Sequence, residues 1–363
     1  MPTTYPSKST ASYDSIKLGI DAHAQYYWVS RQVDGATPQP VQKMNYDELM
    51  LFVVKQQKLT GNVVTCYEAG AFGFHLHRRL EELGIKNYVV QPQDWDERGK
   101  GVKNDRLDAA ALCQRLDRYE RGNKKAFSVV RIPTVDEERE RAITRQRQQL
   151  VRERQRLAAM GRSLLATHNI HVTGKWWTGK AWTAIKVQAP AWVIERLEVF
   201  IVILGPLEEQ EVKLMRAIQE AAQEQKIPRG VGPLTFEILR REVGDWSRFN
   251  NRRQVSSYTG LCPREHSSGG KRRAGRVSKS GNPRVRAMLV EMVWRMIRWQ
   301  PGYTALLKWA PVLNSPTPNP AAKKKKKNAV VAIARQLAVD LWRVFTGQVE
   351  AEKFGLVYLP EAA

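Results

Sequence analysis

The order of apolar and polar residues changes character along the chain, and the first pattern is that of a sheet with helices. Through residues 16–120, short apolar runs alternate with longer stretches of helical spacing. Short runs rich in β-branched and aromatic residues predict strands, and an apolar residue every three or four positions predicts helices. The order of elements, with three strands before the first helix, predicts a mixed α/β sheet whose first three strands form a meander. Strands are expected at 16–21, 26–33, 41–44, 63–67 and 87–90, and helices at 45–58, 72–83 and 104–119.

Residues 126–226 have a seven-residue period set between Arg- and Gln-rich positions. The period predicts two long helices paired as an antiparallel coiled-coil arm. The Trp- and Gly-rich segment 171–190 between them is expected to form an irregular tip. Such an arm could join two copies of the chain, bind nucleic acid or act as a plain spacer. One series is Ile143, Leu150, Leu157 and Leu164, and the other is Leu197, Leu204, Glu211 and Ile218.

The pattern changes again after residue 226. A Gly-rich turn at 228–233 leads into an expected helix at 234–243, and this arrangement resembles a helix-hairpin-helix, whose backbone amides can hold a phosphate. The Pro- and Asn-rich segment 311–322 predicts a linker, followed by five lysines and a last amphipathic helix at 328–345. The predicted organisation is a tail at 1–15, an α/β domain at 16–125, a helical arm at 126–226, a mainly helical domain at 227–346 and a tail at 347–363.

Charge narrows the class of partner. The formal net charge is +23, and residues 227–363 alone hold 25 basic and 9 acidic residues. A balance this one-sided indicates a polyanion, most often nucleic acid, bound mainly by the C-terminal third. No run of 18 apolar residues is present, which argues against a membrane partner. Three distant cysteines without a C-x-x-C pair argue against a disulfide framework or a zinc site and suit the cytoplasm.

Four carboxylates stand at the ends of predicted elements. Asp21 ends the first strand, Glu68 follows the fourth, and Asp105 and Asp108 share one face at the start of a helix. Oxygen ligands of this kind favour Mg²⁺, and a metal held there could assist attack at phosphorus. The nearby cations Lys103 and Arg106 could hold the nucleic-acid strand. The alternative is that each acid is an ordinary surface residue.

A segment near residue 270 interleaves small residues, hydroxyls and cations. Glycine lets a backbone approach a phosphate and Lys or Arg neutralises it, so a serine there could attack phosphorus and form a phosphoserine ester. Apart from His266 the segment offers no base, so the carboxylate and metal cluster is the expected activator. The alternative is a Ser- and Gly-rich loop that only binds nucleic acid. The cations expected to bind are Lys271, Arg272, Arg273, Arg276, Lys279, Arg284 and Arg286.

Taken together, these motifs resemble the IS-one-ten family of insertion-sequence transposases. GIDAH with Asp21, YEAG with Glu68, and KNDRLDA with Asp105 and Asp108 are similar to the DEDD signature of that family. The sequence SYTGLCPREHSSGGKRRAGRVSKSGNPRVR is similar to its C-terminal transposase domain. The resemblance extends over about 16–346, with both motif sets in the same order.

The resemblance implies properties that composition does not give. The N-terminal domain is expected to be RuvC-like, of the RNase H fold, and to use the four acids with Mg²⁺. Ser268, with Ser267 beside it, is the expected nucleophile. The implied partners are donor and target DNA and a structured non-coding guide RNA, with dimers that join into tetramers, in the bacterial cytoplasm at the nucleoid.

Two other readings stay open at this point. A RuvC-like nuclease that hydrolyses DNA with water would need the four acids but not Ser268. A non-catalytic nucleic-acid-binding protein would need neither, and a change at Asp21 would leave its activity unaltered.

Overall fold

The computed structural model describes residues 13–92, 105–223, 225–265, 273–316 and 319–358. The chain forms two compact units, Met1–Ile132 and Pro133–Ala363, and each is described by itself. Within the described residues, no helix is both long enough and apolar enough to span a lipid bilayer.

The first unit contains the predicted sheet. Its strands are β1 (Ile16–Ala22), β2 (Tyr27–Val33), β3 (Gln42–Met44), β4 (Val63–Glu68) and β5 (Lys86–Val90), in the order β3-β2-β1-β4-β5. The first three strands are antiparallel, whereas β4 pairs parallel with both β1 and β5. The mixed sheet and its N-terminal meander, both predicted from the sequence, are therefore confirmed.

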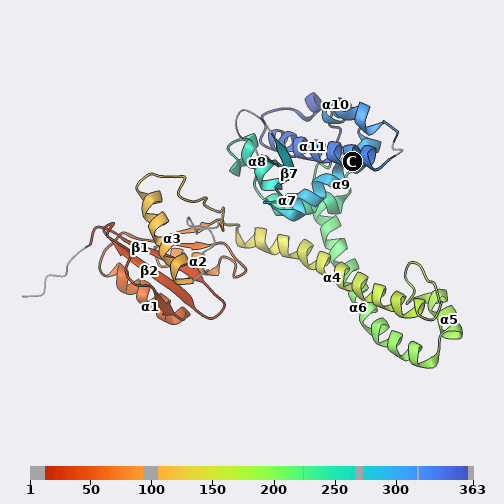
Figure 1. The fold of residues 1–363 in the computed structure, drawn as a ribbon, viewed down its shortest axis with the longest axis horizontal. Coiled ribbons are helices and arrows are strands. Elements are labelled where there is room, and N and C mark those ends of the chain that lie inside the picture. The colour runs from red at the N-terminus through yellow and green to blue at the C-terminus, as the bar shows by residue number, and fades with distance from the viewer. Residues whose placement is uncertain (1–12, 93–104, 224, 266–272, 317–318, 359–363) are drawn as a thin grey trace, which may run out of the picture. The chain divides into compact units, whose positions relative to one another are not determined.

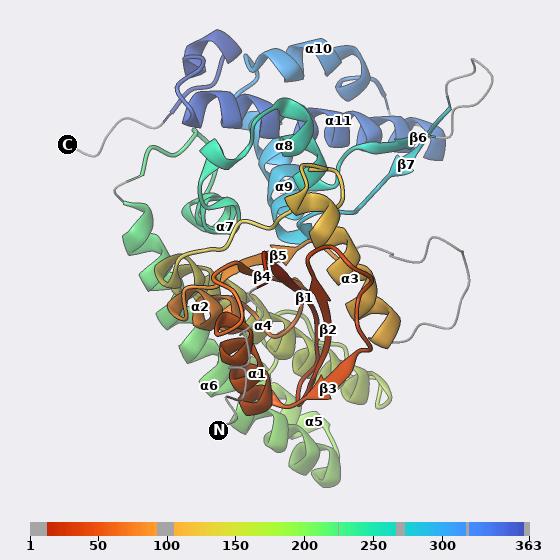
Figure 2. The same ribbon diagram turned by 90° about the vertical axis from the view of Figure 1, so that its left-hand side faces the viewer.

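Three helices cover the two faces of this sheet. Helices α1 (Tyr46–Gln57) and α2 (His75–Glu82) pack with Ile16, Leu18 and Ile20 on one face. Helix α3 (Asp105–Glu120) covers the other face (Figure 2). There Val64 and Cys66 share a buried cluster with Leu112 and Leu116 of α3. The side chain and backbone of Asn45 cap α1 in a reciprocal pair with Glu48, as its position before the apolar stretch suggests. Helix α2 begins at His75 rather than at 72, because Phe72 is half exposed and contributes nothing to the buried face.

The second unit begins with two long helices, α4 (Val135–Ala166) and α6 (Ala191–Ala222), which lie side by side as an arm (Figure 1). All four members of the predicted series on α6 are buried: Leu197, Leu204, Glu211 and Ile218. The irregular tip expected at 171–190 is confirmed only for 171–178, because helix α5 (Gly179–Gln188) forms in the rest of the segment. The tryptophans of this segment supply its core, with Trp176 and Ile185 fully buried.

The remaining elements form a mainly helical body around one core. They are α7 (Pro233–Val243), α8 (Arg252–Thr259), the paired strands β6 (Pro263–Glu265) and β7 (Ala274–Val277), α9 (Pro283–Trp299), α10 (Thr304–Leu313) and α11 (Pro320–Phe345). Short 3₁₀ turns lie at Trp246–Arg248 and Ala351–Phe354, and Ala351 and Leu356 are buried in the same core.

The linker expected at 311–322 is shorter than predicted. Pro311 lies inside α10, and α11 starts at Pro320, so the five lysines are helical. The Asn319 side chain accepts a hydrogen bond from the Ala322 backbone N–H, and proline is favourable at the first position of a helix. A cap and a well-placed proline therefore begin the helix before its apolar stripe.

Candidate functional site

The parallel register of β1 and β4 places two of the predicted acids side by side. Ile20 pairs with Tyr67, so Asp21 and Glu68 are the next residues at the carboxyl ends of adjacent strands. Because side chains alternate along a strand, both acids belong to the face that α3 covers. Glu68 also raises the pKa of the buried Cys66 thiol on that face, although burial is the larger cause.

The other two acids lie in the first turn of α3, which approaches β1 very closely. A Cβ atom on Gly19 would stand 2.4 Å from the carbonyl oxygen of Ala109 and 2.3 Å from the amide nitrogen of Cys113. Only glycine permits this approach without displacement of the helix. Close packing at Gly19 thereby sets how near Asp105 and Asp108 lie to Asp21.

His23 joins the acids and was not singled out by the sequence analysis. Its Nε2 lies 3.0 Å from Oδ2 of Asp21 and 3.5 Å from Oδ2 of Asp105, and one ligand atom from each of the three lies within 4.8 Å of the others. The His23 backbone N–H donates to the Tyr26 carbonyl, and this tight turn folds the histidine back over the strand end. The sequence feature that could have indicated His23 is its position two residues after Asp21 in the GIDAH motif.

The charge at this cluster suits a cation. Burial raises the pKa of the Asp21 carboxyl, Asp105 and Asp108 raise it further, and the hydrogen bond to His23 opposes the shift. The side chains of Asp21, His23 and Asp105 keep 21%, 32% and 39% of their surface exposed, so a substrate can reach them. Carboxylate oxygens with one imidazole nitrogen fit Mg²⁺ and also Mn²⁺.

Aromatic rings hold two cations beside the cluster. The Tyr26 ring stacks on His23 with centroids 4.7 Å apart, and Nζ of Lys43 lies 3.9 Å from the Tyr26 centroid. The guanidinium of Arg106 lies 5.1 Å from the Trp28 ring. These cation–π contacts orient positive charge next to the acids, where a nucleic-acid strand would need it. The other cation predicted here, Lys103, lies outside the described residues.

The predicted serine segment is only partly described. Ser268, Lys271 and Arg272 lie outside the described residues, between strands β6 and β7, which pair antiparallel. Arg273, Arg276 and Lys279 are exposed on or beside β7. Among the described cations of this segment, these three are exposed to solvent, whereas Arg284 and Arg286 are partly buried.

The segment that follows β7 is fixed tightly against the body. A Cβ atom on Gly281 would lie 2.5 Å from both the Gly260 amide nitrogen and the Tyr258 carbonyl oxygen. The Asn282 side chain caps α9 and donates a 2.9 Å hydrogen bond to buried Glu242. Nη1 of Arg286 donates to the carbonyl oxygens of Thr259 and Lys279, so this predicted contact residue also braces the loop.

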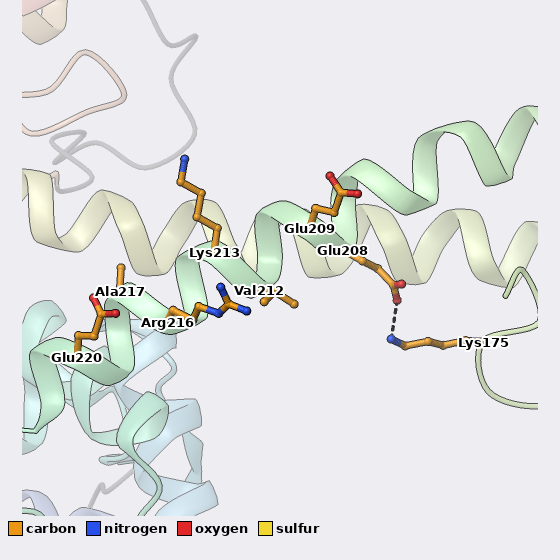
Figure 3. A pocket seen from close by; sticks show the side chains of 8 residues that line it. All are labelled: Lys175, Glu208, Glu209, Val212, Lys213, Arg216, Ala217 and Glu220. Carbon is orange, nitrogen blue, oxygen red and sulfur yellow. Dashed lines mark ion pairs between the residues drawn. The ribbon is translucent and has the colours of Figure 1, made fainter. Parts of the chain in front are cut away.

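A hollow of about 730 Å³ lies along α6, next to Lys175 (Figure 3). Nζ of Lys175 forms an ion pair with Glu208 at 3.0 Å. Basic and acidic residues balance in its lining, three against three, so it has no preference for a polyanion. The lining residues are Lys175, Glu208, Glu209, Val212, Lys213, Arg216, Ala217 and Glu220.

Comparison with known proteins supplies the family. Residues 225–308 match the model of the Transposase IS116/IS110/IS902 family. A putative transposase of Sinorhizobium fredii is 32% identical over 319 residues, which cover 80% of this chain and 78% of that protein. The chain belongs to the IS110 family of insertion-sequence transposases. The resemblance seen in the sequence motifs is confirmed.

Two further relatives carry the names of insertion sequences. The transposase for element IS1111A of Coxiella burnetii is 27% identical, over 76% of this chain and 75% of its own length. The transposase for element IS1328 of Yersinia enterocolitica is 27% identical, over 80% and 87%. Within this IS110 chain, the match to the family model starts just after α6, runs into α10 and spans the β6–β7 pair.

Proposed function

We propose that this transposase cuts and rejoins DNA with two sets of groups, a Mg²⁺-binding DEDD site in a RuvC-like, RNase H-like first unit and the nucleophile Ser268 in the second. Donor and target DNA are the substrates, and a structured guide RNA selects them. Dimers that join into tetramers bring the cutting sites together. The observation that carries the proposal is the grouping of Asp21, His23 and Asp105 beside the register position of Glu68.

Asp21, Glu68, Asp105 and Asp108 would hold the metal, with His23 adjacent. A bound Mg²⁺ supplies charge stabilisation at phosphorus and lowers the pKa of an attacking oxygen. The Ser268 hydroxyl attacks the phosphorus of a DNA phosphodiester, its proton passes to a carboxylate or water, and a DNA hydroxyl leaves. The phosphoserine ester conserves the energy of the broken bond, and the hydroxyl end of another strand can reverse the step to rejoin DNA.

The cations beside the acids have a separate task. Lys43 and Arg106, held over Tyr26 and Trp28, would bind the phosphates that flank the reacting one. Their orientation by aromatic rings costs little side-chain freedom on binding, which favours a defined strand position.

The test is strand exchange by the Asp21→Asn variant with Asp47→Asn as the matched control. Asp47 is exposed in the first turn of α1 and is not a member of the cluster, so the control makes the same chemical change at an acid without a proposed metal role. Asp21→Asn is expected to abolish strand exchange in Mg²⁺ and to keep nucleic-acid binding, whereas Asp47→Asn keeps both. Full strand exchange by a folded Asp21→Asn protein would reject the metal site.

A further inference from the structure

A second hollow in the C-terminal unit lies between α4 and the first turn of α9. Its volume is about 640 Å³, within the range of ligand pockets in proteins. In contrast to the hollow on α6, basic residues outnumber acidic ones three to one in its lining. The lining residues are Ala142, Arg145, Gln146, Gln148, Gln149, Arg152, Glu153 and Arg284.

Two of the three arginines, Arg145 and Arg284, face one buried carboxylate, that of Glu242. Arg145 donates two 2.8 Å hydrogen bonds to Glu242, whose side chain is fully buried. Nε of Arg284 donates to Oε1 of Gln148 at 3.0 Å and lies 3.7 Å from the Glu242 carboxylate. Arg152 forms no hydrogen bond or ion pair with any residue that the structure describes. Glu242 therefore pairs closely with Arg145 and more distantly with Arg284, so its single negative charge leaves net positive charge among the three arginines.

The groups around the hollow do not neutralise the positive charge of its arginines. Burial lowers the pKa of the Arg284 guanidinium, and the positive charges of Arg145 and Arg152 lower it further against the pull of Glu242. The acid at the rim, Glu153, is paired with Arg156 at 2.8 Å. The positive end of helix α9, which starts at Pro283, adds to the same potential. An anion in the hollow would offset all of these contributions.

We infer that this hollow binds the sugar–phosphate backbone of a nucleic-acid strand, with Arg152 and Arg284 as phosphate ligands. Guanidinium groups bind phosphate oxygens through paired hydrogen bonds, and the glutamine amides of the lining add neutral donors. None of the eight lining residues is aromatic, so the site offers no platform for stacking a base and fits the backbone. The inference deepens the proposed function and rests on it for the nature of the polyanion.

The arrangement also gives the Arg145–Glu242 ion pair a function. Arg145 and Glu242 are 97 positions apart and join α4 to α7, while Gln148 holds the Arg284 side chain from α4. The Arg145–Glu242 pair lies beside Arg284 and, with Gln148, orients its guanidinium group. Phosphate binding at this point would therefore hold the arm helix α4 and the start of α9 to the same strand.

The decisive variant is Arg152→Gln in the full chain. Arg152 is exposed and unpaired among the described residues, so its loss should leave folding intact. The probes are a fluorescent DNA duplex and an RNA hairpin with equal numbers of phosphates, each titrated over a range of salt concentrations. We expect about tenfold weaker binding to at least one probe. The slope of log affinity against log salt should fall by about one, because one phosphate contact is lost.

Two matched variants distinguish the loss of this phosphate contact from the loss of one positive charge elsewhere on the surface. Arg196→Gln removes the same charge from an exposed position on α6 outside the hollow, and it should change the slope much less. Arg152→Lys keeps the charge without the paired donors, and it should recover the slope and part of the affinity. Wild-type affinity and slope of Arg152→Gln on both probes, or an equal loss in Arg196→Gln, would overturn the inference.

These binding measurements show whether the hollow binds DNA or RNA. They do not depend on DNA cleavage. A loss confined to the duplex assigns the hollow to DNA, and a loss confined to the hairpin assigns it to RNA. All measurements can be repeated in the Asp21→Asn background, where no cutting is expected. Failure of the proposed metal chemistry would appear as cutting by that variant, whereas failure of the phosphate site would appear only in binding.

Discussion

Replacement of Gly19 by alanine should disable the acidic cluster without touching any of its members. The new Cβ would lie 2.3 Å from the Cys113 amide nitrogen, whereas ordinary contact begins near 3.4 Å. The atoms in the way are backbone atoms of α3, which cannot rotate aside as a side chain can. Helix α3 must therefore withdraw by about 1 Å, and Asp105 and Asp108 move with it.

The size of the effect follows from this displacement. Overpacking of a core costs about 1–3 kcal/mol, and backbone obstruction places Gly19→Ala near the upper end. For a unit of this size, the melting temperature should fall on the order of 10 °C. A metal site tolerates errors of only about 0.5 Å, and a 1 Å misplacement can reduce a rate about 100-fold.

The assay is Mg²⁺-dependent strand cleavage at a temperature where the variant is folded, together with thermal melting by circular dichroism. Gly61→Ala is the matched control, because a Cβ at Gly61 would meet nothing within 4 Å. The control should melt and cleave as wild type. Wild-type melting and wild-type Mg²⁺ dependence of Gly19→Ala would refute the reasoning that the β1–α3 contact sets the site.

Three other predictions concern the second unit. Burial would raise the pKa of Glu242, but hydrogen bonds from its neighbours lower it below 4.5. Its contribution to stability is therefore present above pH 4.5 and lost as the pH falls through the folded-state pKa. Glu242→Gln should lower the stability at neutral pH by about 1–3 kcal/mol, because the hydrogen bonds to the carboxylate weaken while the partly exposed Arg145 stays solvated. The variant should also show a shallower acid dependence in urea melts. Ser268→Ala should bind DNA but trap no covalent adduct, while Ser267→Ala keeps some activity; an adduct on Ser268→Ala, detected by mass spectrometry, would reassign the nucleophile. Charged residues at both Leu157 and Leu207 should disrupt assembly measured by light scattering, and an unchanged mass of the folded variant would make the arm a spacer or an RNA contact.

The sequence alone predicted the first unit well because its signals are local. The order of strands and helices follows from the spacing of apolar residues along the chain. The cap at Asn45 follows from the ability of an Asn side chain to accept a hydrogen bond from the first turn of a helix. The α/β unit and the meander were therefore predictable. Placement of Asp21 at a strand end was predictable for the same reason.

Features that depend on distant residues were not predictable. His23 joins the acids only through a turn closed by the Tyr26 carbonyl, and α3 approaches only because Gly19 meets Cys113. Glu242 looked like any acid in a helix until Arg145, 97 positions earlier, was found beside it. Helix α5 was missed because buried tryptophans, rather than a regular apolar stripe, stabilise the tip.

The arm has a consequence for how related elements can diverge. Buried positions on α6 recur every seven residues, from Leu197 to Ile218, while the inner end is anchored by Arg145 and the tip is closed around Trp176. Insertion of seven residues, close to two helical turns, in each helix would return the buried stripe of α6 to nearly the same face and lengthen the arm by about 10 Å, leaving both ends unchanged. Arm length can therefore change in steps of about two helical turns while the two ends keep their contacts.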